Sequence, residues 1–166
     1  MVDHLSTYLN DHLAGSSAAL EFLDQLRDGD PNLPIVAFAA QLKREIFQDR
    51  QQIERLMEDL QMEVSAPRKA AAWVADKLSR IMLRMDDRGN GMLRQLEILE
   101  ALSVGIAGKQ LLWRTLAQLS ESRTKLKGPD YATLLARAED QRNRIEAYRM
   151  HTATMTFSRT PIGAVA

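Results

Sequence analysis

The chain has 166 residues, with 22 basic and 22 acidic side chains, so its formal net charge is zero. A chain of this length is expected to form one domain with a core of its own. The lack of a basic excess argues against nucleic-acid binding, and the lack of cysteine excludes disulfides, thiolate metal sites and thiol nucleophiles.

The sequence also lacks the patterns of membrane proteins. No apolar run reaches the length that spans a bilayer. The first residues, MVDHLSTYLND, do not have the basic and then apolar layout of a signal peptide. We therefore expect a cytoplasmic protein with no membrane partner.

The first two helices are predicted to form a hairpin. Helical periodicity covers residues 3–27, and the sequence DGDP ends this segment, because glycine terminates helices and proline cannot continue them. A second helix is predicted over residues 35–60, with Asn32 as its cap and Pro34 in its first turn. The connection is short, so we expect the two helices to be antiparallel neighbours.

The second helix carries a residue that does not suit its apolar face. Asp49 lies between Ile46 and Ile53 in a stripe of apolar residues at helical spacing. A buried carboxylate is unfavourable unless it is paired, so Asp49 requires partners on other helices. The other apolar members of the stripe are Ile35, Ala39, Leu42, Leu56 and Leu60.

Three more helices are predicted after this one. A short third helix covers residues 65–85, a fourth covers 92–119, and a fifth covers 130–155 after the polar segment SESRTKLKGPD. Residues 1–155 are expected to form one bundle, and residues 156–166 a flexible tail.

The fourth helix is the most apolar and contains two glycines. We predict that its buried face is formed by Ile98, Ala101, Gly105, Gly108, Leu112, Leu116 and Leu119. Glycine lowers helix propensity, so Gly105 and Gly108 indicate either a close backbone approach or a space that must be kept.

Five polar residues are predicted to meet in one layer of the bundle. At a rise of 1.5 Å per residue, His12, Asp49, Lys109 and Gln141 fall at a similar height, and Glu45 lies one turn from Asp49. Each of the four long helices contributes to this layer. Such a coincidence is not expected of solvated surface residues.

The helix lengths and their order resemble the ferritin-like superfamily, as does the opening segment YLNDHLAGSSAALEFL. The resemblance implies an all-α four-helix bundle made of two antiparallel hairpins, joined by a crossover that contains the short helix. It also implies a pair of metal ions held by Glu-x-x-His motifs, but no such motif is present. The third residue after each relevant glutamate is not histidine: Glu45 leads to Gln48, Glu54 to Met57, Glu97 to Glu100 and Glu139 to Arg142.

Three interpretations of the polar layer remain open. The first is a buried ion pair of Asp49 with Lys109, oriented by His12 and Gln141. The second is an altered metal site that uses His12, Glu45 and Asp49, although Lys109 would repel a cation there. The third is a lysine that forms a Schiff base with a carbonyl substrate.

We expect a non-enzymatic ferritin-like bundle that acts through protein association, with itself as a homodimer or with another protein. No set of acid, base and nucleophile supports an enzyme, and no cofactor is predicted. The alternative is a metal-binding protein with an altered ferritin-type site.

Overall fold

The computed structural model describes residues 4–28, 33–64 and 91–158, and it is all-helical in these ranges. Four long helices and one turn of 3-10 helix are present: α1 (His4–Arg27), α2 (Pro34–Asp59), α4 (Gly91–Ser122), η2 (Thr124–Leu126) and α5 (Tyr131–Phe157). The predicted third helix, over residues 65–85, lies outside the described ranges, as does most of the predicted C-terminal tail.

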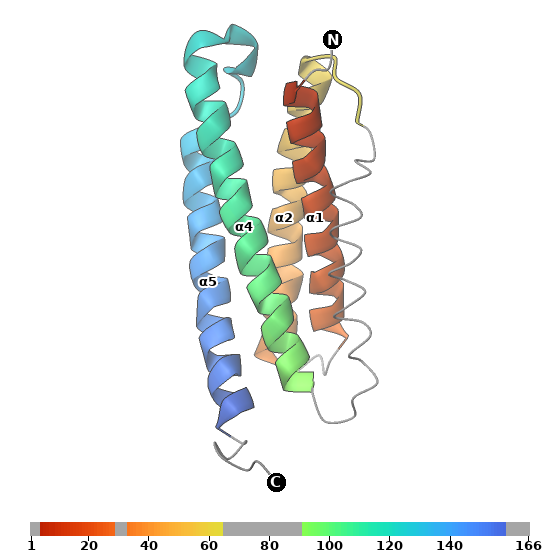
Figure 1. Ribbon diagram of the computed structural model, residues 1–166, viewed down its shortest axis with the longest axis vertical. Coiled ribbons are helices and arrows are strands. Elements are labelled where there is room, and N and C mark those ends of the chain that lie inside the picture. The colour runs from red at the N-terminus through yellow and green to blue at the C-terminus, as the bar shows by residue number, and fades with distance from the viewer. Residues whose placement is uncertain (1–3, 29–32, 65–90, 159–166) are drawn as a thin grey trace.

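The directions of the long helices agree with the prediction. Figure 1 shows α1 and α2 running antiparallel, α4 and α5 running antiparallel, and α2 and α4 running in the same direction. α1 packs against α2, α4 packs against α5, and the two hairpins meet mainly through α1 and α4. α2 therefore ends at the opposite end of the bundle from the start of α4.

One hydrophobic core joins the four helices. It includes residues of every long helix, with Trp113 of α4 and Leu42 of α2 fully enclosed. Apolar residues at helical spacing on α2 and α5 face this core, as the sequence predicts. Among the described residues, no helix combines the length and the apolar character needed to cross a membrane.

A capping side chain is present at the start of α5 but not at that of α2. Pro34 is the first residue of α2, where its missing amide hydrogen leaves no bond unmade. The cap position is Leu33, which has no capping side chain, and Asn32, the predicted cap, lies outside the described residues. At the start of α5, Asp130 accepts a hydrogen bond from the Thr133 amide at 3.1 Å.

The orientation of α4 differs from the prediction. Ile98, Leu112 and Leu116 are buried as expected, but Gly105 is exposed and Ala101 is only partly buried. The buried face instead contains Leu96, Leu99, Leu102, Ile106 and Trp113. α4 is apolar on most of its circumference, so periodicity alone does not decide which side faces the core.

Candidate functional site

A cluster of charged side chains surrounds the buried carboxylate of Asp49, whose residue is 2 % exposed. Lys109 of α4 and Arg137 of α5 both donate hydrogen bonds to it. Gln141 donates from Nε2 to Asp49 Oδ2 at 3.3 Å and accepts from Lys109 Nζ at 2.5 Å. The structure thus brings three of the expected layer residues together and adds Arg137.

The ammonium of Lys109 is largely buried, which disfavours its charge, and the carboxylate of Asp49 stabilises it there. The Lys109 side chain is only 12 % exposed. Burial lowers the pKa of Lys109, because it disfavours the charged form, and attraction to Asp49 opposes this shift. Arg137 is less enclosed, with 28 % of its side chain exposed. Asp49 is therefore essential to the charge balance of the cluster.

Glu45 belongs to a neighbouring ion pair and is not bonded to Lys109. Arg144 donates to Glu45 Oε2 at 2.5 Å, and Gln41 donates to Oε1 at 3.0 Å. Burial raises the pKa of Glu45, but the hydrogen bonds from Arg144 and Gln41 outweigh it and hold this pKa below its ordinary value. Glu45 is therefore ionised, and both of its carboxylate oxygens already accept hydrogen bonds.

His12 lies near Asp49 and Lys109, beside the same cavity, but it does not orient their ion pair as predicted. Its ring makes an edge-on contact with the ring of Tyr8, with the ring centroids 4.7 Å apart. Within the described ranges no hydrogen bond joins His12 to Asp49 or Lys109. Burial lowers the pKa of His12, and the nearby charge of Asp11 opposes this shift. The imidazole therefore does not orient the ion pair.

The residues of the alternative metal site do not converge. In the parts of the chain that the structure describes, no three histidine, cysteine, aspartate or glutamate side chains are grouped so that they could hold a metal ion. The oxygens of Asp49 already accept from Lys109, Arg137 and Gln141. A cation at this point would have to displace two positive groups, which is electrostatically unfavourable. That the protein binds no metal is still a prediction, and metal analysis of the purified protein tests it.

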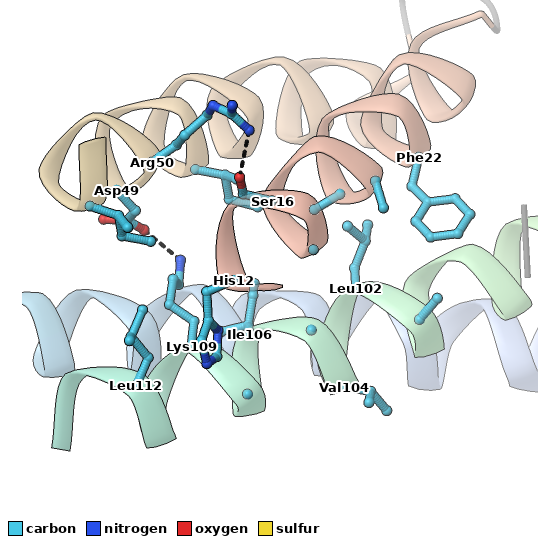
Figure 2. Close-up of a pocket in the computed structure, with 18 of the residues that line it drawn as sticks. His12, Ser16, Phe22, Asp49, Arg50, Leu102, Val104, Ile106, Lys109 and Leu112 are labelled. Atoms are coloured by element: carbon cyan, nitrogen blue, oxygen red, sulfur yellow. Dashed lines mark hydrogen bonds and ion pairs between the residues drawn. The ribbon is translucent and has the colours of Figure 1, made fainter. Parts of the chain in front are cut away.

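A cavity of about 270 Å³ lies beside this cluster, among residues of α1, α2 and α4. Figure 2 shows Phe22 toward one end of it and Asp49 and Lys109 at the other, with Leu102 and Ile106 between them. The walls are mainly apolar. The cavity therefore combines an apolar body with one charged end.

Three helical glycines line this cavity. Gly15 of α1 and Gly105 and Gly108 of α4 are all in its wall, and a Cβ added at any of them would meet no described atom within 4 Å. Glycine inside a helix lowers stability by about 1 kcal/mol relative to alanine. Of the two explanations for Gly105 and Gly108, the structure favours a space over a close backbone approach.

Arg50 fixes the wall between α1 and α2. Its guanidinium donates to the Leu13 carbonyl at 2.9 Å, to Ser16 at 3.0 Å and to Ser17 at 2.7 Å. Its Nε donates to Glu54 at 2.8 Å. These bonds tie the cavity side of α2 to the middle of α1, and they leave Arg50 engaged with the protein.

Sequence reasoning missed the two arginines and the cavity. Arg137 precedes Gln141 by one helical turn, and Arg144 follows it by less than one turn, so both lie near the same face of α5. A search for cations within one turn of each layer residue would have found them. The cavity has a weaker signal, which is the set of glycines that interrupt two helices.

The chain matches no known protein family, no curated protein and no solved structure.

Proposed function

We propose that this protein is a non-enzymatic helical bundle that binds a small, mainly apolar molecule in the cavity between α1, α2 and α4. The observation that carries the proposal is a cavity lined by three helical glycines and closed at one end by the Asp49 and Lys109 ion pair. Sites for small molecules in proteins are concave and mainly apolar, with a few polar groups that fix the orientation of the ligand.

The size of the cavity supports a ligand of modest dimensions. A cavity of about 150 Å³ with apolar walls is known to hold benzene. The present cavity, at about 270 Å³, has less than twice that volume. A molecule of about ten non-hydrogen atoms is therefore the appropriate size.

The polar groups near the cavity support binding more than catalysis. A reaction needs an acid, a base or a nucleophile free to act on a substrate. Asp49 accepts from three donors, and Lys109 donates to two acceptors as a charged ammonium, so neither is free to act as a base or a nucleophile. The charge also argues against Schiff-base chemistry at Lys109, since the reacting form is the free amine.

A thermal unfolding experiment with a neutral apolar probe tests the proposal. Indole is a suitable probe, and at one hundred times its dissociation constant it should stabilise the folded protein by about 2.7 kcal/mol, which raises Tm by about 5 to 10 °C. Gly105→Leu, which places a side chain in the cavity wall, should abolish the increase.

Thr115→Leu is the matched control, because it adds a similar side chain at an exposed position of α4 outside the cavity. This variant should keep the full indole-dependent increase in Tm. An increase that survives Gly105→Leu, or no increase in the unmodified protein, would contradict the proposed function.

Association with a second copy is a second candidate, and one observation favours it. Val104, which also borders the cavity, and Leu111 are 62 % and 59 % exposed and lie two turns apart on one side of α4. Sedimentation analysis of the unmodified protein and of the Val104→Glu, Leu111→Glu variant tests it. A dimer that dissociates in the variant supports association through α4, and a monomer in both rejects it.

The remaining expectations from the sequence belong to the same proposal. The parallel directions of α2 and α4 support a ferritin-like arrangement, in which a crossover joins two hairpins. We also propose, from the sequence, that the protein is located in the cytoplasm. An altered metal site at His12, Glu45 and Asp49 is the weaker alternative, since Asp49 and Glu45 are each paired with arginine.

A further inference from the structure

We propose that the ligand is a medium-chain aliphatic carboxylate, with its carboxylate against the ammonium of Lys109 and its chain directed toward Phe22. This inference rests on the proposed binding function and adds the chemical class of the ligand. Three features carry it: the shape of the cavity, the donors at its polar end and the charge of the cluster around Asp49.

The cavity is elongated along the helices. Its α4 wall extends from Ala101 to Leu112, which is about 16 Å at 1.5 Å per residue. Its volume of about 270 Å³ is small for that length, so a narrow molecule fits it better than a broad one. A saturated chain of about eight carbons suits this volume and spans the part of the wall from Lys109 to Leu102, which is about 10 Å at 1.5 Å per residue.

The ion pair of Asp49 and Lys109 at the polar end of the cavity offers a free donor and no free acceptor. A lysine ammonium has three N–H groups, and two of those of Lys109 are directed at Asp49 and Gln141. No described residue accepts the third. The carboxylate of Asp49 is in turn occupied by Lys109, Arg137 and Gln141. The group on the ligand that completes this end must therefore accept a hydrogen bond.

The charge at this end favours an anionic acceptor over a neutral one. Asp49 supplies one negative charge between the two positive charges of Lys109 and Arg137. The next carboxylate, Glu45, is neutralised by Arg144. Asp140 also contacts Arg144, but its side chain is 64 % exposed, so water screens its charge. Asp11 of α1 also lines the cavity, but its residue is exposed, so water screens its charge as well. A ligand carboxylate supplies the missing negative charge.

Arg50 is the other cation in the cavity wall, and its own carboxylate partner makes it the weaker partner for an anion. Its Nε donates to Glu54, and its Nη1 donates to Ser16, Ser17 and the Leu13 carbonyl. Lys109, by contrast, shares the single carboxylate of Asp49 with Arg137. Lys109 is therefore the group that sets the position of the carboxylate, and the chain extends from it along the apolar wall.

Titration calorimetry with octanoate and its neutral analogue octanamide tests this inference. Octanoate should bind the unmodified protein at least about tenfold more tightly than octanamide, because the charge-assisted hydrogen bond to Lys109 adds to its affinity. In Lys109→Met this preference should disappear while octanamide binding is kept. Lys43→Met is the matched control, since it also removes a lysine paired with an aspartate of another helix, but outside the cavity.

The outcomes separate this inference from the proposed function. Equal affinities of octanoate and octanamide would leave the binding function standing and overturn the carboxylate assignment. No binding of either compound, together with no effect of indole, would overturn both. A preference for octanoate that persists in Lys109→Met would also overturn the assignment, because the carboxylate would then lie elsewhere.

A measurement on the unmodified protein guards against a variant that does not fold. Nuclear Overhauser effects should connect the terminal methyl group of octanoate with the ring of Phe22, and the protons next to the carboxylate with the side chain of Leu112 near Lys109. The reverse set of contacts, or contacts with neither residue, would overturn the inference.

Discussion

The glycines of α4 permit a test in which stability and binding change in opposite directions. Replacing Gly105 and Gly108 with alanine adds two methyl groups that meet no described atom within 4 Å. Neither glycine has the positive φ that only glycine adopts readily. The substitution should therefore introduce no strain in the folded state.

The magnitude follows from helix propensity. Alanine is more favourable than glycine inside a helix by about 0.8 to 1.0 kcal/mol, so the double variant should gain about 2 kcal/mol in the free energy of unfolding. For a chain of this size that gain raises Tm by about 4 to 8 °C. The same methyl groups occupy part of the cavity wall at Gly105 and Gly108, so the affinity for indole should fall.

Urea denaturation gives the free energy of unfolding, and calorimetry gives the affinity for indole. Gly128→Ala is a control for a general effect of adding alanine, because Gly128 lies outside the helices and outside the cavity. A loss of stability in the double variant would refute the reasoning, since it would mean that the glycines serve a close contact. Unchanged binding in a stabilised variant would refute the assignment of the cavity as the site.

Three further predictions concern the polar groups. Asp49→Ala should lower the free energy of unfolding by about 3 kcal/mol in urea denaturation, because it leaves Lys109 as an unpaired buried charge. Lys109→Ala should lower it by less, since Arg137 remains on Asp49, and equal losses would contradict the sharing of Asp49 by Lys109 and Arg137. Burial holds the pKa of His12 below its ordinary value of 6.5, so the unfolded chain binds more protons between the two pKa values and stability should fall as the pH drops below 6.5. His12→Gln should reduce this loss between pH 7 and pH 5, and an unchanged pH dependence would exclude His12 as its source. Protein expressed with iron, zinc and manganese should retain no metal after dialysis, whereas near-stoichiometric metal that is lost in His12→Ala would establish the alternative function.

The parts of the fold that were predicted correctly rest on strong periodicity. α2 and α5 each have an apolar stripe with a polar interruption in its middle, Asp49 in one and Gln141 in the other. A polar residue inside such a stripe must find a partner, so the approach of these two residues to Lys109 could be anticipated. Asp49, Gln141 and Lys109 make contact because burying any of them without a polar partner is unfavourable.

The parts that were missed depend on packing that the sequence does not specify. The rotation of α4 is set by its contacts with three neighbours, and its nearly uniform apolar surface gave no preferred side. Gly105 and Gly108 were therefore placed in the core, although they line the cavity. His12 lies near the ion pair, as its height in the bundle predicts, but height does not decide which side chains form hydrogen bonds.

The most direct test of the cavity as a ligand site is a methyl NMR titration with indole on protein labelled at its isoleucine methyl groups. Ile46, Ile53 and Ile106 line the cavity, whereas Ile98 and Ile145 are buried in the core outside it. The account predicts saturable shifts of the first three signals, with the signals of Ile98 and Ile145 nearly unchanged. Uniform small shifts of all five signals, or no shifts at concentrations up to the solubility of indole, would contradict it.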